Sequence, residues 1–503
     1  MARYKDTDIE SGQGLFLTVN LKEQLLPGTF EYMLDELIGS KIDISDFDIN
    51  YKNDETGSKA IPPAVLIKVI IYGYSKGMKS SRKIYELCKC NIIAKALSCG
   101  FEPHWTTIAD FISSNSEIFK SIFVKVLAYC VELGLVGGET FAIDGVRLPS
   151  NASIELSGKE EGFKKKLKAY RKMAEKHVEK HKRQDKRGEL TKEAEKNYLK
   201  RQKKLNRQIE KLSNFLEHME KKEGKKGEEI KSNITDNESA VIKTSVGYIQ
   251  GYIGIAVSDR KNQIILHAEA VGNANEGEYL PELLDNTVSN LKEVDIDPPE
   301  GKKFIALSDA NYFSEDNLEA CHKRNIEVII PDGTQNRRLG EDGKRRLEAI
   351  DFEYCEEGDY YICVNGAKLK NAGKNNLGGK EGKKYRANVK ACRSCPHYAR
   401  CIRSKKSISE IKHGRTILIT KSNKPGSLCN IMRKKLGTDE YKDQYENRMQ
   451  IIEPVFANIK YCKGLNRFTL RSYKKVNAQW NLYCIVHNLG KCLNGYNLNI
   501  GYI

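Results

Sequence analysis

The sequence lacks an uninterrupted hydrophobic run long enough to cross a membrane. Its most apolar stretch, residues 118–136, is broken by Lys120, Lys125 and Glu132. A membrane-spanning helix needs about 20 consecutive apolar residues, so this stretch predicts a buried helix instead. The N-terminus also lacks the pattern of a secretory signal peptide, because Met1-Ala-Arg-Tyr-Lys leads into polar sequence. We therefore expect no membrane partner.

Acidic residues are too few to balance the basic ones. The 503 residues include 84 Lys and Arg against 67 Asp and Glu, which leaves a net charge of +17. This surplus favours a polyanionic partner, with nucleic acid ahead of a membrane surface. A chain of this length can bury a large core, and we expect it to form several domains.

The 14 cysteines are the next informative feature. In a chain without a signal peptide they predict reduced thiols, a cytoplasmic location and, wherever they cluster, a metal site. One cluster lies in the polar, loop-rich stretch 332–437. Because such a stretch has little apolar core of its own, a bound metal would contribute much of its folding energy.

Four thiolates in this stretch can form a tetrahedral site for a structural zinc ion. The candidate ligands are Cys363, Cys392, Cys395 and Cys401. The second and third form a Cys-x-x-Cys pair, which is the firmest part of the pattern. Cys355 competes with Cys363 as the fourth ligand, and His397 is a weaker candidate. The alternative is a set of ordinary reduced cysteines in a loop domain.

Two short apolar stretches each end in an aspartate. They are Thr140-Phe-Ala-Ile-Asp144-Gly and Phe304-Ile-Ala-Leu-Ser-Asp309-Ala. Each predicts a short buried strand with its aspartate at the C-terminal end, and ligands bind at that edge of open α/β sheets. For either stretch alone, the alternative is a strand followed by an ordinary Asp turn.

A third carboxylate lies in a stretch with helical periodicity. Apolar residues recur there at spacings of three and four: Met449, Ile452, Val455, Phe456 and Ile459. Glu453 lies within this stripe, where a bare carboxylate is costly unless it is paired or binds a metal. Lys460 follows about two helical turns later, so it shares the face of Glu453. With Tyr445 and Arg448 this set suits a divalent metal beside phosphates; the alternative is an amphipathic helix with an ordinary salt bridge.

These segments resemble the DDE transposases of bacterial insertion sequences. The resemblance covers nearly the whole chain and rests on Ala142 to Ser153, Ser308 to Leu318, Tyr445 to Lys460, Gly464 to Arg471 and Trp480 to Leu489. It implies a ribonuclease-H-like catalytic core. The family's metal-binding triad falls on Asp144, Asp309 and Glu453. Its Tyr-Arg-Glu-Lys signature falls on Tyr445, Arg448, Glu453 and Lys460.

The chain departs from the family pattern at three places. The spacing from Arg448 to Glu453 is one residue longer than in the commonest form of the signature. Pro454 follows Glu453 directly, and a proline biases the residue before it away from regular helix. Asn311 stands where a glycine is usual, in the turn after Asp309.

The resemblance implies an enzyme that binds the ends of an insertion sequence and catalyses DNA strand cleavage and transfer. Two Mg²⁺ ions about 4 Å apart, held by the triad, would activate a water or a DNA 3′-hydroxyl and stabilise the leaving oxygen. Tyr445, Arg448 and Lys460 would position phosphates near the cut. Trp480 could stack on an unpaired base, although burial is the commoner outcome for tryptophan.

The implied partner is double-stranded DNA, both transposon ends and target, bound by a homodimer at the nucleoid. The resemblance also favours Cys363 over Cys355 as a zinc ligand, because Cys-x-x-Gly precedes the Cys-x-x-Cys pair in related transposases. Two other functions remain open. One is a catalytically silent DNA-binding protein derived from a transposase, and the other is a basic RNA-binding or structural coiled-coil protein.

In chain order the sequence predicts an α/β protein with six segments. They are an all-helical DNA-binding domain (1–137), the first core strand (138–153), a helical hairpin arm (154–230), further core strands and helices (231–331), the cysteine-rich insert (332–437) and C-terminal catalytic helices (438–503). The core should be a five-stranded mixed sheet flanked by helices, because hairpin-linked strands precede a strand-helix-strand unit.

The arm and the N-terminal helices each allow two interpretations. Residues 164–222 are rich in Lys, Arg and Glu, with coiled-coil spacing of apolar residues. They predict an antiparallel hairpin with helices roughly 40 Å long, either solvated or lying along DNA phosphates. The N-terminal helices, one starting at Pro62-Pro63 and one capped by Thr106 or Thr107, form either a helix-turn-helix reader of DNA or a packing domain.

Overall fold

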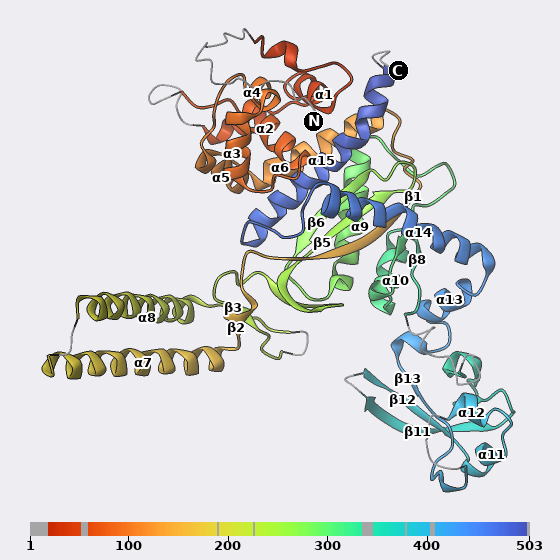
Figure 1. The fold of residues 1–503 in the computed structure, drawn as a ribbon. Coiled ribbons are helices and arrows are strands. Elements are labelled where there is room, and N and C mark those ends of the chain that lie inside the picture. The colour runs from red at the N-terminus through yellow and green to blue at the C-terminus, as the bar shows by residue number, and fades with distance from the viewer. Residues whose placement is uncertain are drawn as a thin grey trace, which may run out of the picture. The chain divides into compact units, whose positions relative to one another are not determined.

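The computed structural model describes seven stretches of the chain: residues 19–51, 59–188, 191–224, 227–333, 346–377, 380–402 and 408–499. The chain divides into two compact units, Met1–Phe111 with Leu493–Ile503, and Ile112–Cys492. Figure 1 shows the elements in colours that run along the chain. Within the described stretches, no helix combines enough length with enough apolar character to cross a bilayer.

The first unit is helical, as the sequence predicts. Its helices are η1 (Lys22–Gln24), α1 (Phe30–Leu37), η2 (Ser45–Asn50), α2 (Pro63–Ser75), α3 (Ser81–Cys90), α4 (Ile92–Leu97) and the start of α5 (Trp105–Ser114). α2 begins at the expected proline, whose fixed φ suits a first helical turn. α5 begins at Trp105, so it is capped by His104 and not by Thr106 or Thr107 as predicted: the His104 side chain accepts a hydrogen bond from the Thr106 amide.

The second unit is built on a mixed β-sheet. Its strands are β1 (Thr140–Pro149), β4 (Ala240–Thr244), β5 (Gly247–Asp259), β6 (Ile265–Val271), β7 (Ile305–Ser308) and β8 (Glu327–Ile329). The order is β4-β5-β1-β7-β8, with β6 also on β5. β1 is antiparallel to β5 and parallel to β7, and β7 is parallel to β8.

The sheet has six strands, not the five that the sequence analysis predicted. The difference arises at β5, which is 13 residues long. β1 pairs with residues 251–259 of β5 along one edge. Along the other edge, β4 pairs with residues 247–251 and β6 with residues 253–258, one after the other. Two short strands therefore share one position in the sheet.

Helices flank the sheet. They include α6 (Ser116–Glu132), η4 (Glu276–Tyr279), α9 (Leu280–Glu293), η5 (Ala310–Tyr312), α10 (Glu315–Lys323), α14 (Asp439–Ala457) and α15 (Tyr473–Asn499). α15 covers part of β6 through side-chain amides. Asn488 bonds to the backbone N and O of Ile265, and Asn477 to those of Ala270. These bonds satisfy strand groups that would otherwise be open to pairing with another chain.

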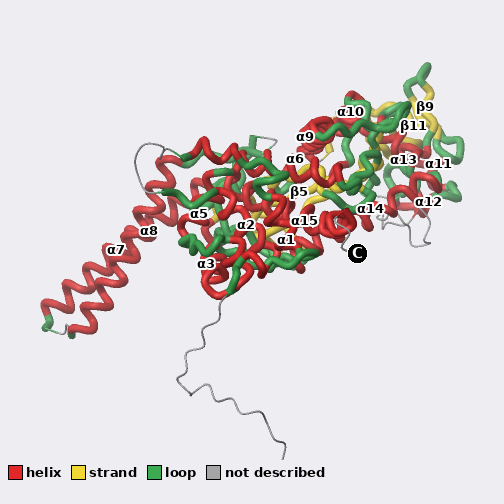
Figure 2. Tube along the Cα trace, turned by 90° about the horizontal axis from the view of Figure 1, so that it is seen from above, coloured by secondary structure: helices red, strands yellow, loops and turns green. Residues whose placement is uncertain are grey.

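The arm lies between β1 and β4. α7 (Glu160–Lys186) and α8 (Lys192–His218) run side by side (Figure 2), and β2 (Ser157–Gly158) pairs with β3 (Ser232–Asn233). Phe163 is fully buried, with its ring 5.4 Å from that of Phe215. Leu205 and Leu212 are also buried. The arm therefore has an apolar seam of its own.

The insert has more core than the sequence indicated. Its antiparallel sheet has the order β13-β12-β11-β10-β9. The elements are η7 (Ala349–Asp351), β9 (Glu353–Cys355), β10 (Tyr360–Ile362), β11 (Lys368–Leu377), β12 (Lys380–Ala387), α11 (Val389–Arg393), α12 (Tyr398–Cys401), η8 (Ile408–Glu410), β13 (Thr416–Ile419), η9 (Lys421–Asn423) and α13 (Leu428–Lys435). Phe352, Tyr361, Leu369 and Tyr385 belong to its buried cluster. The prediction of little core was wrong, because single core residues such as Leu369 and Tyr385 are flanked by basic residues, which conceals the strands.

α14 continues through Pro454, although a proline was expected to disturb the helix at Glu453. Such a proline lacks the N–H that would bond to the carbonyl four residues earlier, here that of Gln450. The side chain of Gln263 compensates, since its Nε2 donates to this carbonyl at 2.9 Å. Gln263 lies in the turn between β5 and β6 with φ of +60°, and its Oε1 accepts from Lys491 of α15 at 2.7 Å. One turn residue thus links the sheet, α14 and α15.

This arrangement predicts that Gln263 and Pro454 are energetically coupled. Gln263→Gly keeps the positive φ and removes the bond to Gln450, so it should lower the free energy of unfolding by about 1–3 kcal/mol. Pro454→Ala supplies a helical donor to Gln450, so Gln263→Gly should cost about 1 kcal/mol less in that background. Trp480 fluorescence during denaturant unfolding, in a Trp105→Phe background that leaves one tryptophan, measures both costs. Equal costs in the two backgrounds would contradict the coupling.

Candidate functional site

The two strand aspartates lie next to each other. In the parallel pairing of β1 with β7, Ile143 is opposite Ser308, and Asp144 and Asp309 are the next residues. Asp309 directly follows the C-terminal end of β7, as predicted, and caps η5. Asp144 lies in the middle of β1 and not at its end, because β1 continues its pairing with β5 as far as Pro149. The two carboxylates therefore meet where β1 loses one of its neighbours.

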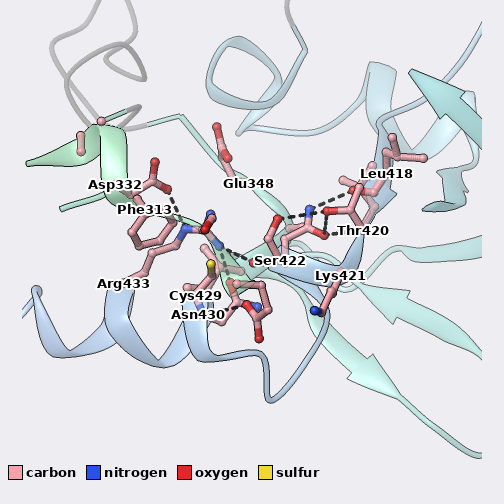
Figure 3. Close-up of a pocket in the computed structure, with 18 of the residues that line it drawn as sticks. Phe313, Asp332, Glu348, Leu418, Thr420, Lys421, Ser422, Cys429, Asn430 and Arg433 are labelled. Carbon is pink, nitrogen blue, oxygen red and sulfur yellow. Dashed lines mark hydrogen bonds and ion pairs between the residues drawn. The ribbon is translucent and has the colours of Figure 1, made fainter. Parts of the chain in front are cut away.

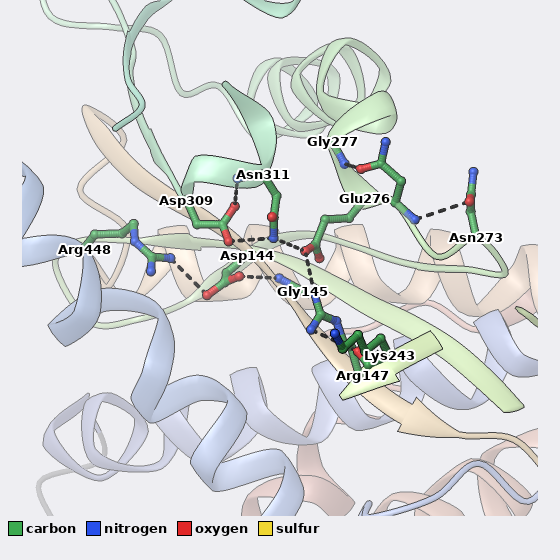
Figure 4. Close-up of polar contacts among 11 residues, drawn as sticks. Asp144, Gly145, Arg147, Lys243, Asn273, Glu276, Gly277, Asp309, Asn311 and Arg448 are labelled. Atoms are coloured by element: carbon green, nitrogen blue, oxygen red, sulfur yellow. Dashed lines mark hydrogen bonds and ion pairs between the residues drawn. The ribbon is translucent and has the colours of Figure 1, made fainter. Parts of the chain in front are cut away.

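Each aspartate is held by hydrogen bonds (Figure 4). Asp144 accepts one from the Gly145 amide at 2.8 Å and one from Nη1 of Arg448 at 3.0 Å. Asp309 accepts bonds from the backbone N–H and the side-chain Nδ2 of Asn311, both at 2.9 Å. Both carboxylates therefore have defined orientations.

A third carboxylate, Glu276, joins this pair, and the sequence analysis missed it. Glu276 begins η4, and only 3% of it is exposed. Its Oε1 accepts a hydrogen bond from Nδ2 of Asn311 at 3.0 Å and lies 3.9 Å from Nη2 of Arg147 (Figure 4). The available sequence signal was its place shortly after β6, much as Asp309 follows β7. The polar residues around it made this segment resemble an ordinary turn.

Burial and the repulsion of neighbouring carboxylates raise the pKa values of Glu276 and Asp309. Burial, followed by the charges of Asp309 and Asp144, raises the pKa of Glu276 to about 7, while Arg147 opposes the rise. Burial, and then the charge of Asp144, raise the pKa of Asp309. Carboxylates that repel one another in this way gain from a nearby proton or cation.

The donor set suits a hard divalent cation. Mg²⁺ prefers carboxylate oxygens, and Asp144 and Asp309 present them from adjacent strands. Oε2 of Glu276 is buried without a hydrogen-bond partner among the described residues, a cost that a nearby cation would offset. Nowhere in the described stretches do three or more His, Cys, Asp or Glu side chains stand so that they could hold a metal. The aspartate pair therefore fits part of a cation site.

Of the signature residues, Arg448 is the one that joins the cluster. Besides its bond to Asp144, its guanidinium lies 5.8 Å from the centre of the Tyr445 ring. Burial raises the pKa of Tyr445, so the phenol stays neutral beside the guanidinium. Arg448 points to Asp144, whereas Glu453, five residues later on α14, is exposed.

The expected apolar stripe of α14 is only partly right. Ile452, Val455 and Ile459 are buried, as predicted. Met449 and Glu453 are exposed, and Ile451 is buried in addition. Glu453 thus does not lie among buried residues. Lys460 lies in the π-helical turn η10 (Asn458–Cys462), which ends the regular spacing that put it on the face of Glu453.

Trp480 is fully buried, so it is not available to stack on an unpaired base. Its Nε1 donates to the Ile255 carbonyl at 2.9 Å, and its ring lies 6.4 Å from that of Phe468. The prediction of a DNA contact from Trp480 was wrong, because α15 packs this side chain against the sheet. His487 is structural, as expected: burial lowers its pKa to about 4.

The four cysteines predicted to bind zinc line one small cavity. It measures about 20 Å³, and its lining includes Cys363, Cys392, Cys395 and Cys401. The Arg415 amide donates to Sγ of Cys392 at 3.3 Å, and burial raises the pKa of the Cys401 thiol to about 11. Neither Cys355 nor His397 is among the described residues that line it. Cys363, and not Cys355, therefore lies beside the same cavity as the other three thiols. The described residues nevertheless form no group of His, Cys, Asp or Glu that could hold a metal ion.

A larger cavity lies beside η5 and the insert (Figure 3). Its volume is about 1100 Å³. Arg433 bonds to Asp332 at 2.7 Å and lies 5.2 Å from the centre of the Phe313 ring. Lys421 forms an ion pair with Asp316 at 2.6 Å. Because both cations already have carboxylate partners, we interpret this cavity as a polar junction between α13 and its neighbours.

Comparison with known families supports the resemblance. A family model for the transposase DDE domain matches residues 362–493, and one for a transposase domain (DUF772) matches residues 19–114. No curated protein matches the chain. The first match includes the four cysteines and the Glu453 helix, but it does not extend to Asp144 or Asp309. Together the matches support a DDE transposase of the insertion-sequence type.

The raised pKa of Glu276 predicts a pH-dependent stability. Between its unfolded pKa of 4.5 and about 7, the unfolded chain ionises while the folded side chain keeps its proton. Relative to a neutral residue, the contribution of Glu276 to the free energy of unfolding is therefore fully present below pH 4.5. It falls by about 3 kcal/mol as the pH rises to 7. The free energy of unfolding of Glu276→Gln should thus rise relative to that of the wild type over this range. Denaturant unfolding in EDTA, followed by Trp480 fluorescence in the Trp105→Phe background, measures the difference in stability between the two proteins. A constant difference from pH 4.5 to 8 would contradict the pKa shift.

Proposed function

We propose that this chain, which is similar to the DDE transposases of insertion sequences, binds the ends of such an element and catalyses metal-dependent cleavage and transfer of DNA strands. The observation that carries the proposal is the placement of Asp144 beside Asp309 on two in-register strands. The strand order supports a ribonuclease-H-like core, since the strand on one side of β1, β5, is antiparallel to it and the strands on the other side, β7 and β8, are parallel to it.

The carboxylates have separate parts in this proposal. Asp144 and Asp309 would hold the divalent cations, and the resemblance supplies Glu453 as the third ligand. Mg²⁺ at such a site activates a water or 3′-hydroxyl and stabilises the leaving oxygen. The chain itself fixes the ligands: Arg448 and the Gly145 amide orient Asp144, and Asn311 orients Asp309.

Double-stranded DNA is the proposed partner, bound by a homodimer in the cytoplasm. The net charge of +17 supports a polyanionic partner. Tyr445, Arg448 and Lys460 are proposed to position phosphates near the cut. The basic arm, residues 154–230, would add phosphate contacts outside the site, and the N-terminal helices would bind the terminal repeats.

A catalytically silent DNA-binding protein is the second candidate. Glu453 favours it, because this side chain is exposed and forms no metal-holding group with the two aspartates in the described stretches. Such a protein would bind the ends of the element without cutting them. Cleavage and binding must therefore be measured separately.

The proposal predicts that Asp144→Asn, Asp309→Asn and Glu453→Gln each abolish cleavage while DNA binding persists. Each change keeps the side-chain shape and removes a charge from a metal ligand. Cleavage should therefore fall more than about 100-fold, which exceeds the usual loss when a residue that only supports a metal ligand is replaced. The measurement is nicking of an oligonucleotide carrying the element's end in Mg²⁺, with affinity measured in parallel. Glu440→Gln, in the first turn of α14, is the matched control. Near wild-type cleavage by any of the three would remove that residue from the mechanism.

The thiol cluster predicts about one zinc per chain, held by Cys363, Cys392, Cys395 and Cys401. Because zinc binds the thiolates, Cys392→Ser should lose the metal and destabilise the insert. Metal analysis of freshly purified wild type and mutant decides the matter. Cys90→Ser, at an exposed cysteine of α3, should keep its zinc. A wild type without zinc, or a Cys392→Ser protein with full zinc content, would exclude the site.

A further inference from the structure

Glu276 is the one buried carboxylate of the cluster that the triad does not use. Its segment is locked onto the segment that follows Asp309. A Cβ at Gly277 would lie 2.3 Å from the Asn311 carbonyl oxygen, so the two backbones pass too closely for any side chain there. Asn317 reinforces this contact, since its Nδ2 donates to the carbonyls of Gly277 at 2.8 Å and Tyr312 at 2.9 Å. Glu276 therefore has a defined position relative to the aspartates.

A single amide connects Glu276 to the catalytic pair. The side-chain Nδ2 of Asn311 donates to Oδ2 of Asp309 at 2.9 Å and to Oε1 of Glu276 at 3.0 Å. The backbone N–H of Asn311 bonds to Oδ1 of Asp309 at 2.9 Å. Glu276 thus fixes the rotation of the amide that in turn fixes Asp309 (Figure 4).

The other oxygen of Glu276 lies against Gly145, the residue that follows Asp144. A Cβ at Gly145 would lie 2.0 Å from Oε2 of Glu276 and 2.5 Å from Cγ2 of Ile253. Only a glycine next to Asp144 leaves room for this oxygen, which has no hydrogen-bond partner among the described residues. An unpaired buried oxygen costs stability, so this placement is poorly explained by stability alone.

We propose that Glu276 is a positioning residue, which acts through Asn311 on Asp309 and thereby sets the affinity of the aspartate pair for a divalent cation. This inference rests on the proposed function of that pair. Partners of metal ligands typically change metal affinity by about 10- to 100-fold when removed. The bond from Asn311 requires an oxygen at position 276 and not a charge, which separates this role from simple electrostatic attraction.

The test is Mn²⁺ binding to the full chain without DNA, followed by electron paramagnetic resonance. Glu276→Ala should weaken binding at least about 10-fold. Asn311→Ala should weaken binding similarly. The double variant should bind Mn²⁺ as tightly as the more weakly binding of the two single variants, because both changes remove the same link. Glu276→Gln keeps an acceptor oxygen and should stay within about 3-fold of the wild type. Glu278→Ala, at an exposed residue of the same η4, should bind as the wild type does.

Two outcomes would overturn the inference. Wild-type Mn²⁺ affinity in Glu276→Ala would show that Glu276 does not position the pair. Equal weakening in Glu276→Gln and Glu276→Ala would assign the effect to charge. If Glu276→Ala fails to fold, Asn311→Ala, at an exposed position, carries the same test.

A separate control distinguishes this inference from the proposed function. If the wild type and Asp309→Asn bind Mn²⁺ equally, the aspartate pair is not the cation site and the proposed function fails with it. If Asp309→Asn loses binding while Glu276→Ala and Asn311→Ala keep it, only the positioning role fails.

Discussion

The parallel pairing of β1 with β7 is the constraint on which the rest of the site depends. It fixes the register that puts Asp144 beside Asp309, and two neighbouring carboxylates repel each other. The surrounding structure offsets this repulsion with the Arg448 guanidinium on one carboxylate and the Asn311 amides on the other. A sheet that holds like charges together in this way favours the binding of a cation.

Polar side chains from turns and helix faces, besides buried apolar ones such as Trp480, hold the helices on this sheet. Gln263 occupies the turn after β5 and bonds to both α14 and α15. Asn477 and Asn488 of α15 bond to the backbone of β6. Gln450, which accepts the bond from Gln263, lies two residues after Arg448 in α14, so Gln263 anchors to the sheet the part of α14 that carries Arg448.

The sequence predicted the elements better than the side-chain environments. The strand patterns before Asp144 and Asp309 were readable, because buried strands are continuous apolar runs. The end of β1 was not, since nothing local indicates that a strand continues after losing one neighbour. The exposure of Glu453 depends on how α14 rotates against the sheet, and periodicity defines that only to within a residue.

The missed residue, Glu276, shows why some of the site could not be predicted. Its burial depends on the glycines at positions 145 and 277, which allow close contact between segments far apart in the sequence. Its partner Asn311 departs from the family pattern, yet its bonds to two carboxylates exist only in the folded chain. The insert was misread for a related reason, because its core forms only when five short strands assemble.

The most direct test of the account is affinity cleavage by Fe²⁺ in place of Mg²⁺. With added ascorbate and hydrogen peroxide, a bound Fe²⁺ reduces the peroxide to hydroxyl radicals, which cut the polypeptide backbone close to the metal. The account predicts cuts near both Asp144 and Asp309, suppressed by excess Mg²⁺ and absent from Asp309→Asn. Cuts confined to the cysteine-rich insert, or the same cuts in Asp309→Asn, would contradict the assignment of these two aspartates as the cation site.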